Sequence, residues 1–169
     1  MTKSDQMTKP DQPSPHPPNP RFQALIESVS KASGLETEVG NAGLLLQAGP
    51  YQLRVMPDGS DDERLVIEVE LADAAGAPAA ALALLHRINH VSRFHHGWQI
   101  SLDEDEHIVL HTQRRLARTD AGRLQELMAS GLERAAAAAG LWHKALATLE
   151  GESGAGLNDL KLDASALRV

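Results

Sequence analysis

Histidine is the side chain in this sequence whose spacing most directly suggests chemistry. Four of the chain's eight histidines fall within residues 86–96. His86 and His90 are four residues apart, which places two imidazoles on one side of a helix. His107 and His111 are also four residues apart, which places them on one face of a strand. Because neutral imidazole is a common zinc ligand, these residue types alone would indicate a metal site.

The surroundings of the histidines favour a different interpretation. Winding residues 78–94 as a helix puts the first histidine pair on the polar side. The alternation of residues 107–113 puts the second pair on the solvent side of a strand. The sequence has no cysteine and no HExxH motif that would complete a ligand set. We therefore predict no metal site, and we keep as the alternative a small metal-binding or ligand-binding regulatory domain that uses the histidine cluster.

Composition limits the class of protein further. The chain has 169 residues and no cysteine, which fits one domain with a hydrophobic core and without thiol chemistry. Its formal net charge of -7 argues against a nucleic-acid partner, because phosphate contacts need clustered lysine and arginine. P-loop, dinucleotide-binding and nucleophile-elbow motifs are missing, so we predict no enzymatic activity and no cofactor. We find no signal peptide or membrane span, and we predict a cytoplasmic protein without a membrane partner.

The hydrophobic pattern predicts the elements that position these residues. Residues 1–20 hold six prolines and are expected to form a disordered arm, whereas residues 151–169 are expected to form a flexible tail. Residues 21–150 are the predicted domain. Its expected elements are a helix over 22–34, strands over 43–48, 51–56 and 64–72, a helix over 78–94, strands over 98–102 and 107–113, and a helix from about 120 to 149. This order predicts an α+β fold in which helices pack on an antiparallel sheet.

The predicted helix over residues 78–94 has an unusually wide apolar side. The apolar side spans about half of the circumference at ~100° per residue, which is more than packing on one small sheet requires. We expect the chain's own sheet to cover one part of this side and a second copy of the chain to cover the other. Burial in a single core is the alternative. The preferred interpretation is a homodimer built on this helix.

Three short segments follow one another in the middle of the chain. They are LLHRIN at 84–89, Gly97, and WQISLD at 98–103. Together with the order of the elements, they resemble the class I chaperones of bacterial type III secretion, the family that includes the Tir chaperone. In that family, LL-x-x-(I/A)-N precedes G-x-x-(I/L)-x-(L/I)-D. The resemblance covers residues 22–149, and the proline-rich arm and the tail lie outside it.

The resemblance implies a function and a set of partners. It implies a homodimer without enzymatic activity that binds the N-terminal segments of secreted effector proteins in the bacterial cytosol and keeps them export-competent. It also suggests the ATPase of the secretion apparatus as a further partner. A bound segment would lie extended over apolar surface and at a sheet edge. The residues predicted for effector binding are Leu25, Val29, Leu44, Leu46 and Val66. The residues predicted for the dimer interface are Leu84, Leu85, Ile88 and Val91.

Overall fold

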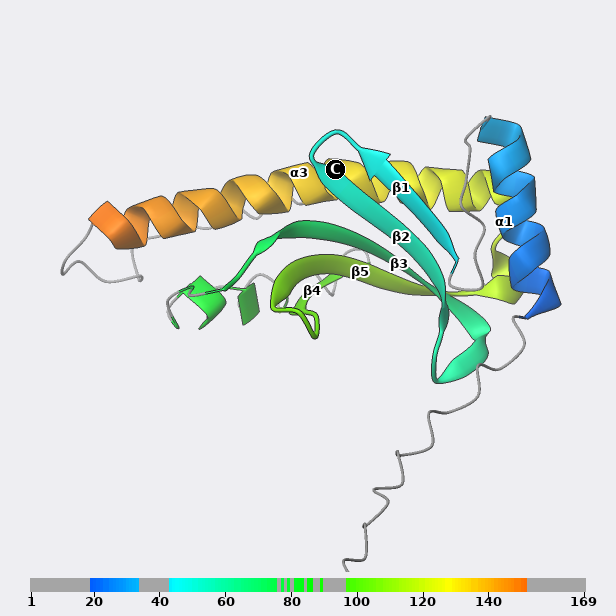
Figure 1. Cartoon of the computed structure of the whole chain (residues 1–169), viewed down its shortest axis with the longest axis horizontal. Helices are drawn as coiled ribbons and strands as arrows, with labels where there is room; N and C mark the ends of the chain where they lie inside the picture. Colours follow the sequence, from blue (N-terminus) through cyan, green and yellow to red (C-terminus); the bar gives the residue numbers. More distant parts are fainter. Residues whose placement is uncertain are drawn as a thin grey trace, which may run out of the picture.

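The computed structural model describes helices packed on one antiparallel sheet (Figure 1). The helices are α1 (Pro20–Ser33), the short 3₁₀ helix η1 (Leu116–Arg118) and α3 (Ala121–Gly151). The strands are β1 (Leu44–Ala48), β2 (Tyr51–Asp58), β3 (Asp61–Asp73), β4 (Gln99–Leu102) and β5 (His107–Arg115). The described residues are 19–33, 43–75, 77, 79, 81–83, 85, 86, 89 and 97–151.

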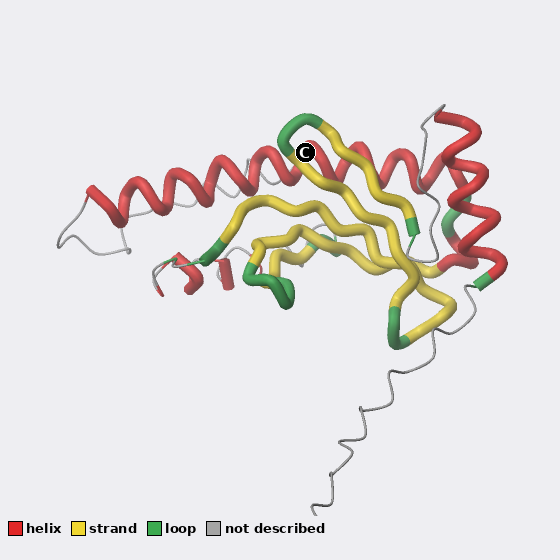
Figure 2. The backbone as a smooth tube through the Cα atoms, viewed as in Figure 1, coloured by secondary structure: helices red, strands yellow, loops and turns green. Residues whose placement is uncertain are grey.

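The five strands form a single sheet in the order β1-β2-β3-β5-β4. Each neighbouring pair is antiparallel. Figure 2 shows the strands as one curved layer with α3 running along it. The outer strands are β1 and β4, and β3, the longest strand with 13 residues, lies in the middle. The sheet and its helices confirm the predicted α+β class.

Alternation along β3 decides which face of the sheet is buried. Leu65, Ile67 and Val69 are fully buried, and the register places Leu53 and Val55 of β2 on the same face. This face carries the core that α3 covers across β2, β3 and β5. Figure 1 shows α1 lying against the N-terminal end of α3. Burying one side of alternating strands under a helix is the main stabilising term expected for such a layer.

The opposite side of the sheet is polar, and we call it the open face. Its residues come from the alternate positions of the strands. They include Arg54 on β2, Arg64, Val66, Glu68 and Glu70 on β3, Gln99 on β4, and His111 and Gln113 on β5. All except the exposed Gln99 and Gln113 are partly buried. Sequence alternation alone therefore separates a core face from a polar face.

Helix α1 begins two residues earlier than predicted, inside the range assigned to the arm. Asn19 acts as its N-cap, because Asn19 Oδ1 accepts a hydrogen bond of 2.9 Å from the Arg21 N–H. Pro20 occupies the first helical position, where its missing N–H costs nothing. Asn19 Nδ2 also donates to the Asp62 carbonyl at 2.6 Å, which ties the start of the helix to β3.

Several predicted boundaries change in the structure. β2 continues through Pro57 to Asp58, and β5 continues to Arg115. The positions described between 79 and 89 are helical, as predicted, and the other positions of that predicted helix lie outside the described residues. Leu102 lies on the same face of the sheet as Ile100, but it is 44% exposed because it lies at the end of an outer strand. None of the helices in the described ranges has the length and apolar character needed to span a membrane.

Candidate functional site

The structure separates the histidines that suggested a metal site. His86 is exposed, and His90 lies outside the described residues. His107 lies near the β4–β5 turn, with its Nδ1 atom 3.3 Å from Asp103 Oδ2. His111 is partly buried on the open face, and this burial lowers its pKa. Among the described residues, neither His86 nor His111 belongs to a group of three possible metal ligands.

Within the described residues, one group of possible metal ligands comes together, at the β4–β5 turn. One ligand atom from each of Asp103, Asp105 and His107 lies within 4.8 Å of the others. Asp103 Oδ1 already accepts hydrogen bonds from the N–H groups of Asp105 and His107, at 3.0 and 2.8 Å. Burial acts to raise the pKa of Asp103, but these hydrogen bonds outweigh burial and lower it. This carboxylate shapes the turn, and the metal-binding alternative is not favoured.

The two outer strands each expose one leucine. Leu45 on β1 is 46% exposed and Leu102 on β4 is 44% exposed, and these are the exposed large hydrophobic side chains among the described residues. An outer strand also presents backbone N–H and C=O groups that can pair with another chain. Both strands are therefore candidate binding edges by side-chain criteria alone.

A side chain from the second predicted helix closes part of the β4 edge. Asn89 Oδ1 accepts a hydrogen bond from the Ile100 N–H, and Asn89 Nδ2 donates to the Ile100 carbonyl. In an antiparallel strand, both backbone groups of one residue point to the same side. The two groups of Ile100 that point away from β5 are therefore occupied by one amide, which imitates a neighbouring strand.

Four of the predicted effector-binding residues lie together beside α1 and β1. Leu25, Val29 and Leu44 are buried in the core, and Leu46 is partly buried against it. Val66 lies on the open face, because it is one position out of phase with the buried residues of β3. The structure thus places the five residues on both faces of the sheet, and their role in binding stays a prediction.

The predicted dimer interface lies mostly outside the described residues. Leu84, Ile88 and Val91 belong to that part of the chain. Leu85 is described, and it is only 7% exposed within the core of its own chain. A buried Leu85 agrees with the expected packing of one side of this helix on its own sheet. It does not test contact with a second copy.

The middle of the open face carries a small ionic network. The Arg54 guanidinium lies 3.6 Å from Glu68 Oε1 and 3.6 Å from Glu70 Oε2, and it donates to Gln52 Oε1 at 2.7 Å. Burial raises the pKa of Glu68, and Arg54 opposes that shift. Such partly exposed ion pairs contribute little to stability. They keep this face polar.

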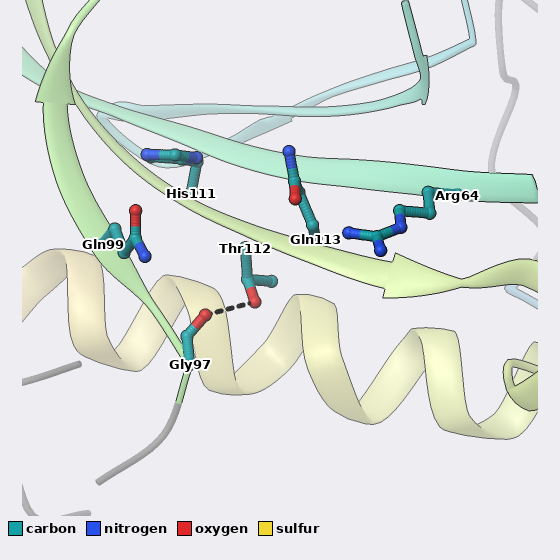
Figure 3. A pocket seen from close by; sticks show the side chains of 6 residues that line it. All are labelled: Arg64, Gly97, Gln99, His111, Thr112 and Gln113. Atoms are coloured by element: carbon teal, nitrogen blue, oxygen red, sulfur yellow. Dashed lines mark hydrogen bonds between the residues drawn. The ribbon is translucent and has the colours of Figure 1, made fainter. Parts of the chain in front are cut away.

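A pocket of about 260 Å³ opens where β4 begins and β5 continues past it (Figure 3). Its lining residues are Arg64, Gly97, Gln99, His111, Thr112 and Gln113. Gly97 has a φ of +67°, a left-handed conformation that favours glycine. The buried Thr112 hydroxyl donates to the Gly97 carbonyl at 2.6 Å and fixes the rim. The pocket is nearly as large as the smallest common ligand pockets.

Sequence reasoning missed the roles of Asn89 and Arg64. It placed Asn89 on the polar side of a helix, and it treated Arg64 only as the start of a strand. Asn89 bonds to a residue 11 positions later, and Arg64 is brought to Gly97 by strand pairing. One available signal was the Asn that closes LLHRIN, the segment that the family resemblance singled out.

The fold is one five-stranded antiparallel sheet with α3 packed on one of its faces. The chain belongs to the Tir chaperone protein (CesT) family, whose match covers residues 24–139. This membership confirms the resemblance to type III secretion chaperones that the sequence indicated. Among curated proteins, none matches the chain significantly.

Solved structures share the fold at low sequence identity. A chain in the Yersinia pestis type III secretion chaperone SycH–YscM2 fragment complex is 21% identical with a TM-score of 0.53, covering 68% of this chain and 97% of that one. A chain of the ExsC–ExsE complex is 18% identical with a TM-score of 0.59, and the coverage is 76% and 95%. A chain of the HopA1–SchA chaperone–effector complex is 16% identical with a TM-score of 0.55, and the coverage is 68% and 88%. These likenesses confirm the chaperone-like fold.

Proposed function

We propose that this chain is a homodimeric type III secretion chaperone that binds the N-terminal segment of secreted effector proteins. It acts in the bacterial cytoplasm without catalysing a reaction, and it keeps the bound segment export-competent. The observation that carries the proposal is the family match over residues 24–139. The HopA1–SchA structure, which has the same fold, is a chaperone–effector complex. The ATPase of the secretion apparatus is a further proposed partner.

The bound segment adds to the sheet at β1. Within the described residues, β1 has one strand neighbour, β2, and it exposes Leu45 beside its free side. Strand addition supplies backbone hydrogen bonds, and apolar side chains supply specificity. Among the predicted residues, Leu46 is the proposed contact at this edge, and Val66, on β3, is a proposed contact only where the segment continues over the open face. Leu25, Val29 and Leu44 lie in the core of the chain, and their proposed role is to support α1 and β1 from within.

The dimer is proposed to form through the second predicted helix. Leu84, Ile88 and Val91 are the proposed contacts with the second copy, and Leu85 supports them from the core of its own chain. Changing Ile88 to Asp is expected to give a folded monomer. Size-exclusion chromatography with light scattering measures this directly, and a folded dimer that survives the change would refute the assignment.

Coexpression tests the function itself. The chain is coexpressed with N-terminal fragments of secreted proteins encoded by neighbouring genes, and the complexes are purified and weighed by light scattering. The proposal predicts a stable complex of two chaperone copies with one unfolded fragment. A monomer at micromolar concentration that retains none of these fragments would count against it.

A matched pair of variants tests the choice of edge. Leu45→Lys and Leu102→Lys change two leucines of nearly equal exposure, on β1 and β4. Each is expected to alter stability by less than about 0.5 kcal/mol, because surface substitutions usually do. Leu45→Lys is expected to weaken fragment binding about ten-fold, equivalent to about 1.4 kcal/mol, whereas Leu102→Lys leaves it unchanged. Weaker fragment binding by Leu102→Lys, with binding by Leu45→Lys unchanged, would assign the binding edge to β4.

A further inference from the structure

The pocket at the start of β4 has an unusual chemical lining for an acidic protein. Five of its six lining residues carry polar side chains, and the charged one is Arg64. Figure 3 shows Gln99, His111 and Gln113 projecting to one side of the sheet, with the Arg64 guanidinium directed toward Gln113. The lining includes no acid, although the chain has a net charge of -7. The local charge is therefore opposite in sign to that of the whole protein.

The Nε of Arg64 already lies beside a carboxylate, but it is not aligned with it as a hydrogen-bond donor. This Nε is the one buried side-chain nitrogen or oxygen among the described residues that has no hydrogen-bond partner. Asp61 Oδ2 lies 2.9 Å from this Nε, but the contact is an ion pair by distance and lacks hydrogen-bond alignment. Asp61 offsets the charge of Arg64 without meeting the direction of its Nε–H, so an acceptor in the pocket that is aligned with this donor would add a hydrogen bond.

Arginines and carboxylates both surround the pocket. Arg115 pairs with Arg64 in the β3–β5 register, and the Arg114 guanidinium lies beside Gly97. Burial and then the neighbouring Arg123 lower the pKa of Arg114, which indicates that positive charges are close together here. The charged groups that oppose these arginines nearby are Asp58 and Asp61, both at Arg64, and Glu68, the register partner of His111.

We propose that this pocket binds a carboxylate group, held by the Arg64 guanidinium and by the amide N–H groups of Gln99 and Gln113. A guanidinium presents parallel donors that match the two oxygens of a planar carboxylate. The volume of about 260 Å³ accommodates a side chain or a small organic acid and is below the usual range for cofactors. The carboxylate belongs either to a free small acid or to an acidic side chain of a bound protein. The proposal does not depend on the chaperone function.

An NMR titration of the full chain tests this site. The signal of the Arg64 Nε–H group is assigned by its loss in Arg64→Gln, and it is followed while sodium acetate or acetyl-aspartate amide is added. Sodium chloride at the same ionic strength is the comparison for simple screening. A saturable shift with either carboxylate supports the site if Arg64→Gln binds at least ten-fold more weakly. The affinity of this variant is read from its backbone signals. Arg21→Gln, at an exposed arginine of α1 outside the pocket, is the matched control and leaves the binding unchanged.

The same titration distinguishes the two sources of the carboxylate, and it includes the outcomes that would overturn the proposal. Acetate that binds as tightly as the blocked aspartate assigns the site to free carboxylates, whereas ten-fold tighter binding of the blocked aspartate assigns it to an acidic side chain. Equal, unsaturated drift with carboxylates and chloride would overturn the proposal. Inorganic phosphate that binds ten-fold more tightly than acetate would overturn the carboxylate assignment. Circular dichroism of Arg64→Gln and Arg64→Lys establishes that the variants are folded, and Arg64→Lys retains part of the binding.

Discussion

The two outer strands of the sheet look alike from their side chains and differ in their backbones. β1 and β4 each expose one leucine, to 46% and 44%. The amide of Asn89 occupies the outward N–H and C=O of Ile100 on β4, and no described side chain does so for β1. Exposed apolar area alone therefore does not select a binding edge, and the availability of backbone groups does.

The largest expected effect on stability comes from a substitution beside β1. Gly43 directly precedes β1 with a φ of +114°, and a Cβ there would lie 2.0 Å from the Val55 carbonyl oxygen. Gly43→Ala should lower the free energy of unfolding by about 3 kcal/mol or more, from backbone strain and a clash with the neighbouring strand. Urea denaturation followed by circular dichroism measures it. Gly59→Ala, at a turn with no atom near the added Cβ, is the control and should change stability far less.

A smaller effect is expected where α3 supports β4. A Cβ at Gly131 would lie 2.7 Å from Cη2 of the buried Trp98, the residue before β4. Gly131→Ala should cost about 1–3 kcal/mol, because overpacking forces the indole to move. Gly140→Ala on the same helix meets no neighbour and should raise stability by up to about 1 kcal/mol. Thermal or urea unfolding of both variants gives the difference, and equal stabilities would contradict the packing described.

Removing the Asn89 amide tests the closed edge directly. Asn89→Ala should lower the free energy of unfolding by about 1–2 kcal/mol, because two hydrogen bonds to Ile100 are lost. The Ile100 amide should also exchange with solvent faster, as hydrogen exchange by NMR would measure. Asn89→Asp keeps the acceptor for the Ile100 N–H and should show a smaller increase in exchange. Unchanged exchange at Ile100 in both variants would show that Asn89 does not close this edge.

The smallest expected effect concerns pH at the strand next to β4. Burial lowers the pKa of His111 below its ordinary value of 6.5, so the unfolded chain takes up the proton before the folded chain does. The contribution of His111 to stability is therefore lost as pH falls below about 6.5. In His111→Gln, the free energy of unfolding should fall less between pH 7 and pH 5 than in the native protein. Identical pH profiles would contradict the burial of this imidazole.

The arrangement of the elements could be predicted from local patterns. Alternation at Leu65, Ile67 and Val69 identified the buried face of β3, and the amphipathic pattern around Ile26 and Val29 identified α1. These patterns are local because side-chain direction repeats every two residues in a strand and every 3.6 in a helix. The histidines also followed their patterns, and so the polar placement of His86 agreed with the sequence.

The features that distinguish the two edges could not be predicted in this way. The Asn89–Ile100 contact and the approach of Arg64 to Gly97 depend on how elements meet in three dimensions. Leu25 and Leu44 were predicted as binding residues, and they are buried in the core of their own chain, to which α1 and β1 both contribute. An apolar pattern shows that a residue is covered, but it does not show whether the chain itself or a partner covers it.

Hydrogen–deuterium exchange of the chaperone with and without a bound effector fragment tests the central claim most directly. The fragment is one that copurifies with the chain on coexpression. Addition of the fragment to the β1 edge predicts slower exchange over residues 44–48 and no added protection over residues 99–102. Protection of residues 99–102 with unchanged exchange in β1 would contradict the account.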